Sequence, residues 1–167
     1  IKYNNLPENL INAVIVTEDK RFFNHYGVDI KGVLRAIYVN LKERRIVQGG
    51  STITQQLAKN LFLTPERSFT RKLHELILSL WLELRFSKKQ ILSIYLNRVY
   101  LGSGTYGVQA ASEKYFNKKV EDLNLYECAV IASLLKAPSR YNPIANKKLS
   151  QERASLVLEN MAKSQMI

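Results

Sequence analysis

Apolar residues recur at intervals of three and four along almost the whole chain, and this spacing restricts the fold more than any other feature. The longest example is a stripe that predicts a helix over residues 69–85 with its apolar side in the core: Phe69, Leu73, Leu76, Leu80 and Leu84. No segment shows the period-two alternation of a half-buried strand. Seven glycines and four prolines are also few for a turn-rich all-β protein. The pattern therefore predicts a mainly α fold, and 167 residues suit a single domain over 1–167.

The same periodicity predicts the remaining helices. They cover about residues 8–18, 30–42, 109–116, 125–136 and 150–161, with a short helix after Ser51 and another after Ser87. Asn5, followed by Pro7 and Glu8, is the expected cap of the first helix. Ser87 and Gln90 have the spacing of a capping box.

The chain is strongly basic, which narrows the classes of partner. Its 25 Lys and Arg against 14 Asp and Glu give a net charge of +11 and favour nucleic acid, an acidic membrane surface or a phosphorylated substrate. The nine tyrosines are scattered and form no aromatic platform, so we do not expect nucleic acid as the partner. No stretch approaches the ~20 apolar residues of a membrane span. Because the chain begins with Ile1, we expect it to be part of a longer protein.

Cys128 is the single cysteine, which excludes an internal disulfide and a cysteine-based zinc site. It lies in an apolar run, so we expect a small buried residue and not a nucleophile.

Glu18 is the first candidate for acid–base chemistry. It follows an apolar helical column formed by Ile11, Val14 and Ile15. Desolvation there would raise the pKa of its carboxyl toward the range useful in general acid–base catalysis. The alternative is a solvated helix end. His25, seven residues on, is by itself more typical of a loop or core histidine.

A second candidate segment runs from Gln48 to Asn60. Two glycines and Ser51 precede a helix, an arrangement that leaves backbone N–H groups free for an anion, although the spacing of a P-loop is missing. Neutral hydrogen-bonding side chains and one lysine then share a face suited to sugar hydroxyls and phosphate oxygens: Thr52, Gln56, Lys59 and Asn60. An ordinary solvated face is the alternative.

The third candidate is a cluster of Arg67, Arg71, Lys72 and Glu75. Arg71 and Lys72 lie four and three residues before Glu75, so both can reach its carboxylate. Alone, such pairs are most often exposed and weak. The functional interpretation is a cationic cluster that holds a diphosphate beside a second carboxylate. Because Glu18 and Glu75 belong to different helices, their spacing does not say whether they meet.

Four segments, in order, resemble the motifs of the peptidoglycan glycosyltransferases, the lysozyme-like domains of class A penicillin-binding proteins and monofunctional transglycosylases. Residues 18–27 resemble E-D-x-x-F-x-x-H-x-G, residues 50–60 match the second motif, and residues 71–75 match R-K-x-x-E. Residues 89–97 match the fourth motif except at Ser93, where the family usually has Glu. The resemblance implies a two-lobed, lysozyme-like helical domain.

That family polymerises lipid II into β-1,4-linked glycan strands, with inversion at the donor anomeric carbon and release of undecaprenyl diphosphate. By motif position, Glu18 is expected to be the general base and Glu75 the second carboxylate. The expected substrate-binding residues are Ser51, Thr52, Gln56, Lys59, Asn60, Arg67 and Lys72. Asp19 is a weak candidate for a metal ligand, and the resemblance leaves room for a divalent cation, Mg²⁺ or Mn²⁺.

The implied partners are lipid II, the growing glycan strand and a membrane surface, with a covalently linked transpeptidase domain allowed for. Residues 22–39, apolar with Lys31 and Arg35, are the expected membrane-contacting part. The expected location is the outer face of a bacterial cytoplasmic membrane. Two alternatives stay open: a lysozyme-like glycan hydrolase and a non-catalytic basic module that binds nucleic acid or membrane.

Overall fold

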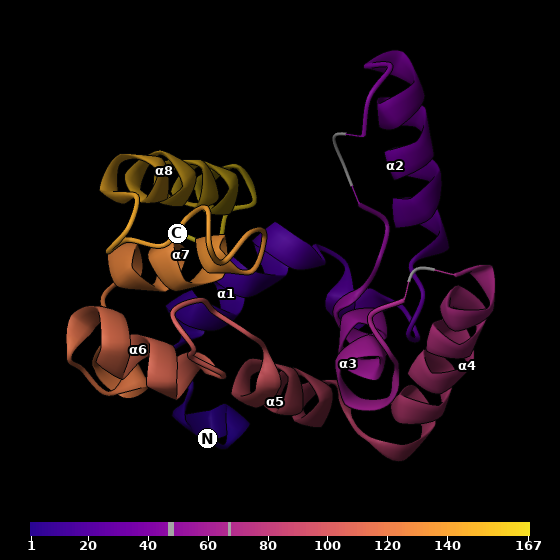
Figure 1. Ribbon diagram of the computed structural model, residues 1–167, viewed down its shortest axis with the longest axis horizontal. Coiled ribbons are helices and arrows are strands. Elements are labelled where there is room, and N and C mark those ends of the chain that lie inside the picture. Colours follow the sequence, from indigo (N-terminus) through magenta and orange to yellow (C-terminus); the bar gives the residue numbers. More distant parts are fainter. Residues whose placement is uncertain (47–48, 67) are drawn as a thin grey trace. The chain divides into compact units, whose positions relative to one another are not determined.

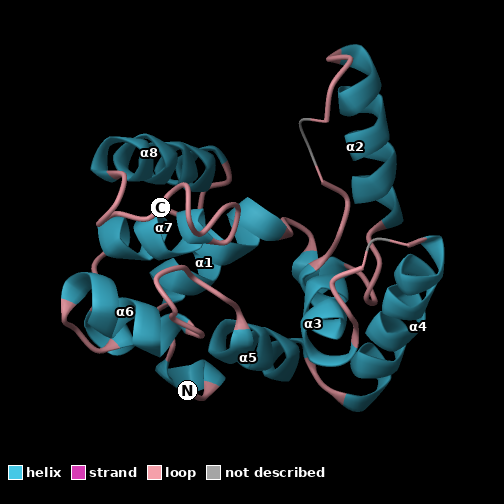
Figure 2. Ribbon diagram, in the orientation of Figure 1, coloured by secondary structure: helices cyan, strands magenta, loops and turns pink. Residues whose placement is uncertain are grey.

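The computed structural model describes residues 1–46, 49–66 and 68–167 (Figure 1). In these residues the regular structure is helical, apart from two isolated β-bridges (Figure 2). The α-helices are α1 (Glu8–Glu18), α2 (Ile30–Lys42), α3 (Ile53–Phe62), α4 (Phe69–Arg85), α5 (Lys88–Arg98), α6 (Val108–Phe116), α7 (Leu125–Leu134) and α8 (Lys147–Lys163). Short 3-10 turns occupy Tyr3–Asn5, Phe22–Asn24 and Val120–Asp122. The prediction of a mainly α fold is confirmed.

The chain forms two compact units, in keeping with the two lobes that the motifs implied. Unit 1 comprises residues 1–20 and 93–167, unit 2 comprises residues 21–92, and the boundary falls within α5. Unit 1 is built around α7, which packs against both α1 and α8 (Figure 1). Every residue of α7 from Glu127 to Leu134 is buried, as expected of a helix that is apolar on all sides.

Unit 2 is built on the packing of α3 along α4. Ile53 and Leu57 of α3 are fully buried, as their spacing predicted. By contrast, α2 buries only Gly32 and Ala36 and leaves large apolar side chains in solvent: Ile30, Leu34, Ile37, Tyr38 and Leu41. Among the described residues, no helix has both the length and the apolar character that crossing a membrane requires.

The apolar stripe of α4 is also exposed, so the prediction that it forms core was wrong. Phe69 and Leu84 are 89% and 86% exposed, and Leu73 and Leu80 are close to half exposed. The buried residues of α4 are Glu75, Ser79 and Leu82. The periodicity correctly identified which residues share a face, but α3 covers a different, partly polar face.

Helix ends follow the predicted caps in one of the two cases. Ser87 and Gln90 form the expected capping box, since Ser87 N donates to Gln90 Oε1 at 2.9 Å and Gln90 N to Ser87 Oγ at 3.3 Å. Asn5 does not cap α1, because it belongs to the preceding 3-10 turn and Pro7 occupies the cap position without a side-chain hydrogen bond. Differences of two or three residues at the ends of α7 and α8 are typical of frayed helix ends.

Cys128 is fully buried on α7, which confirms its predicted placement. Burial, reinforced by the negative charge of Glu127, raises the pKa of the Cys128 thiol to about 12. The reactive thiolate is therefore scarce at pH 8.

We expect iodoacetamide to leave the native protein unmodified at pH 8 and to label Cys128 fully in 6 M guanidinium chloride. Mass spectrometry of both samples checks this, and rapid labelling of the native protein would show that α7 opens readily.

Candidate active site

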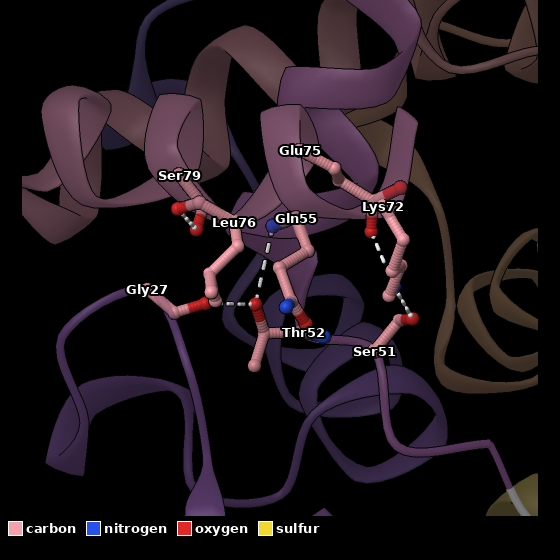
Figure 3. Close-up of polar contacts among 8 residues, drawn as sticks. All are labelled: Gly27, Ser51, Thr52, Gln55, Lys72, Glu75, Leu76 and Ser79. Carbon is pink, nitrogen blue, oxygen red and sulfur yellow. Dashed lines mark hydrogen bonds and ion pairs between the residues drawn. The ribbon is translucent and has the colours of Figure 1, made fainter. Parts of the chain in front are cut away.

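The start of α3 is fixed by a capping box that also holds a distant loop. Thr52 Oγ1 accepts a hydrogen bond from Gln55 N at 3.1 Å, and Gln55 Oε1 accepts one from Thr52 N at 2.9 Å. The Thr52 hydroxyl also donates to the carbonyl oxygen of Gly27 at 2.6 Å (Figure 3). Thr52 and Gln55 are both buried. The Thr52 side chain thus joins the loop at Gly27 to the first turn of α3.

This arrangement modifies the expected anion site at the start of α3. The capping box already occupies the N–H groups of Thr52 and Gln55, so fewer backbone donors are free than the glycine-rich sequence suggested. The remaining predicted side chains of this segment are more accessible. Ser51, Lys59 and Asn60 are exposed, and Gln56 is half-buried.

Lys72 joins the start of α3 to a buried carboxylate on α4. Its ammonium donates to Ser51 Oγ at 2.9 Å and to Glu75 Oε1 at 2.6 Å (Figure 3). The Glu75 side chain is only 3% exposed, whereas that of Lys72 is 49% exposed. Direct contacts therefore bring together Ser51, Lys72 and Glu75. They come from two of the predicted motifs, and Ser51 and Lys72 are 21 residues apart in the sequence.

The burial of Glu75 rules out the interpretation of this pair as an ordinary surface ion pair. A carboxylate removed from water requires a nearby cation or hydrogen-bond donors, and Lys72 supplies both. An ammonium group has three N–H donors, and two of them are used here. The Lys72 side chain is about half exposed, so an incoming anion can also reach its ammonium. Arg71 was also expected to reach Glu75, but in the described part of the chain Lys72 alone forms that ion pair.

Glu18 lies in unit 1, at the last residue of α1, and is half-buried. Its predicted apolar column is confirmed, since Ile11, Val14 and Ile15 are all buried. Burial raises the pKa of the Tyr95 phenol, and the negative charge of Glu18 raises it further, so Tyr95 stays protonated near neutral pH. The link between Tyr95 and Glu18 was not predicted from the sequence. The one indication in the sequence was that Tyr95 is a tyrosine among the aliphatic residues of α5, most of which are buried.

Glu83 was missed by the sequence analysis as well. Its Oε1 accepts hydrogen bonds from Gly27 N, Thr54 Oγ1 and Lys88 Nζ, at 3.0, 2.7 and 2.6 Å. Glu83 follows a leucine-rich run and has a lysine five residues on, which is an unremarkable pattern in a basic helix. Only the folded chain brings these three donors to one oxygen.

Arg67 and Asp19 are the remaining predicted residues. Arg67 lies outside the described residues. Asp19, the weak candidate for a metal ligand, is buried at the C-terminal cap of α1. Within the described residues, no three His, Cys, Asp or Glu side chains gather in a way that could hold a metal ion. A divalent cation therefore stays a prediction from the resemblance, and we assign no step to it.

Comparison with known proteins places the chain in a family. A family model described as Transglycosylase matches residues 1–162. Penicillin-binding protein 1A of Aquifex aeolicus is 50% identical over 161 residues, which are 96% of this chain and 22% of that protein. Penicillin-binding protein 1A of Pseudomonas aeruginosa is 49% identical over 163 residues, 98% of this chain and 20% of that protein.

A crystal structure of penicillin-binding protein 1A from Haemophilus influenzae is also similar, at 36% identity and a TM-score of 0.47, over 69% of this chain and 14% of that one. The chain thus spans about a fifth of the length of the curated relatives that it matches. The family model, in contrast, covers nearly all of the chain. The chain therefore belongs to the transglycosylase family, the peptidoglycan glycosyltransferases that its four motifs resemble.

Proposed function

We propose that this domain polymerises lipid II into β-1,4-linked glycan strands, with inversion at the donor anomeric carbon and release of undecaprenyl diphosphate. The observation that carries the proposal is the buried Glu75 carboxylate held by Lys72, which also reaches Ser51 at the start of α3. A hydrolase that acts on an uncharged glycan does not require such an accessible ammonium. Transfer from a diphosphate donor does require a cation, because the leaving group gains negative charge.

On the donor side, the basic residues bind the diphosphate and offset the negative charge that it gains as it departs. Lys72 offers its half-exposed ammonium, and the exposed Lys59 on α3 adds a second cation. Arg67 joins them by motif position. Preorganised charges of this kind can lower a barrier by several kcal/mol. Glu75 holds Lys72 in place, and Ser51, Gln56 and Asn60 bind the donor's phosphate or sugar.

On the acceptor side, Glu18 acts as the general base. It takes the proton from the 4-hydroxyl of the acceptor GlcNAc while that oxygen attacks the anomeric carbon of the donor. The bond from that carbon to the diphosphate breaks, and the electron pair leaves with the diphosphate. The half-buried position of Glu18 behind an apolar column supports this role, because partial desolvation makes a carboxylate more basic.

We also propose that α2 contacts the membrane in which lipid II resides, on the outer face of the cytoplasmic membrane. Ile30, Leu34 and Ile37 of α2 are exposed, together with Lys31 and Arg35. Apolar side chains beside basic ones favour the surface of an anionic bilayer. A growing glycan strand and a linked transpeptidase domain are the further partners that the proposal allows for.

Replacing Ile30, Val33 and Ile37 with Ser should weaken binding to anionic vesicles by about tenfold or more, because each loses apolar area that would leave water on binding. Co-sedimentation with vesicles of phosphatidylglycerol and phosphatidylethanolamine measures this. A matched triple change to Ser at exposed apolar residues of unit 1, Tyr126, Ile144 and Leu156, keeps the net charge and should leave binding unchanged. Equal binding of the wild type and the α2 variant would exclude α2 as the contact.

Product analysis tests the proposed reaction against the hydrolase alternative. We expect the chain to convert labelled lipid II in detergent into long glycan strands, seen by gel electrophoresis and mass spectrometry, and to leave purified sacculi intact. Shortened sacculus fragments without polymer would identify a hydrolase. Binding without any turnover would favour a non-catalytic module.

A further inference from the structure

Glu83 is a buried carboxylate to which the mechanism above gives no role. Its side chain is only 4% exposed, on the third turn of α4 after Lys72. One of its oxygens, Oε1, accepts hydrogen bonds from three separate segments: the loop at Gly27, the first turn of α3 at Thr54, and the start of α5 at Lys88. All of these residues belong to unit 2.

The Gly27 peptide is held on both sides. Its N–H donates to Glu83 Oε1, and its carbonyl oxygen accepts from Thr52 Oγ1 at 2.6 Å. Gly27 has a φ of +77°, and a Cβ there would lie 3.1 Å from the backbone of Ser79, so the loop fits against α4 only with glycine. Glu83 thus holds two segments against α4. It holds the first turn of α3 through Thr54, and it holds the Gly27 loop, which in turn contacts Thr52.

Ser51 directly precedes Thr52, and Lys72 lies on the same helix as Glu83. The 2.9 Å contact between Lys72 Nζ and Ser51 Oγ therefore depends on how the start of α3 is held against α4. We propose that Glu83 is a positioning residue of the active site: through Thr54 and the Gly27–Thr52 contact, it sets Ser51 within reach of Lys72. Its effect on catalysis rests on the proposed function.

The negative charge of Glu83 is balanced inside unit 2. Lys88 Nζ lies 2.6 Å from Glu83 Oε1 and also 4.4 Å from the centre of the buried Phe22 ring. The Lys88 ammonium thus supplies the counter-charge to the carboxylate that Gly27 N and Thr54 Oγ1 also contact. Gln at this position keeps a carbonyl acceptor for Gly27 and Thr54 but leaves Lys88 without its counter-charge. Ala removes the acceptor altogether.

The variants Glu83→Gln and Glu83→Ala should therefore lower activity to different extents. We expect Glu83→Ala to reduce kcat for lipid II polymerisation by about ten- to a hundredfold, because misplacement of a substrate-holding group by ~1 Å has effects of this size. We expect Glu83→Gln to recover most of the loss and KM to change less than about threefold in both. If Glu83 served folding alone, both variants would yield less folded protein. At equal folded concentration, however, their kcat would equal that of the wild type.

A double-mutant cycle with Ser51→Ala separates positioning from general stability. If Glu83 acts through Ser51, adding Glu83→Ala to Ser51→Ala should cost less than about threefold in kcat. Glu127→Ala is the matched control, since Glu127 is another buried carboxylate paired with a lysine, Lys118, but lies in unit 1. Its effect should be the same with and without Ser51→Ala. Full additivity for Glu83→Ala as well would overturn the proposal.

Hydrogen exchange provides a readout that does not require turnover. In Glu83→Ala, but not in Glu127→Ala, the amides of Gly27 and Gln55 should exchange at least about tenfold faster, since they report on the Glu83 and Thr52 contacts. Unchanged exchange at both amides would overturn the positioning role even if activity fell. If the wild type lacked polymerase activity while exchange responded as expected, the proposed function would fail and the structural role of Glu83 would stand.

Discussion

Lys72→Met should reduce lipid II polymerisation by about 10²–10³-fold, the loss typical of removing one preorganised donor from a developing negative charge. The same change should destabilise the domain, because Glu75 is left buried without its cation. Removing one partner of a buried pair costs about 3–5 kcal/mol, and the half-exposed Lys72 places this site toward the lower end of that range. Chemical denaturation and polymerisation at equal folded concentration measure the two effects.

Two further variants separate these effects. The double change Lys72→Met and Glu75→Gln removes the unpaired charge, so it should recover most of the stability and none of the activity. Lys118→Met is the matched control, because it leaves Glu127 of unit 1 without its lysine in the same way. It should lower stability and leave kcat unchanged. A Lys72→Met variant with wild-type kcat would show that the ammonium has no part in the reaction.

The helices of this chain could be predicted from the sequence, whereas the faces that they bury could not. The predicted bounds of α2 and α4 are those of the structure, because apolar periodicity and local caps determine where a helix begins and ends. The burial of the α4 stripe was predicted wrongly, because periodicity does not say which face a neighbouring helix covers. Here the buried face carries Glu75 and Ser79, whereas Phe69 and Leu84 lie in solvent.

The candidate site shows the same division. Local spacing predicted that Lys72 reaches Glu75, since three residues on a helix share a face. It did not predict the burial of Glu75 or the contact from Lys72 to Ser51, both of which depend on the packing of α3 against α4. Glu83 was missed for the same reason, because its partners Gly27 and Thr54 lie 56 and 29 residues away.

Glu18→Gln tests the central claim most directly. The amide keeps the size and polarity of the side chain at the end of α1 but cannot accept a proton from the acceptor hydroxyl, so polymerisation should fall by about 10²–10⁴-fold. Glu8→Gln, at the exposed start of the same helix, is the matched control and should retain wild-type activity. Circular dichroism and thermal unfolding confirm that both variants are folded.

The measurement is therefore the rate of polymer formation from labelled lipid II by the wild type, Glu18→Gln and Glu8→Gln at equal folded concentration. Polymer from the wild type and from Glu8→Gln, with almost none from a folded Glu18→Gln, is the result expected of a glycosyltransferase with Glu18 as its general base. Polymer from Glu18→Gln at the wild-type rate, or none from the wild type, would contradict it.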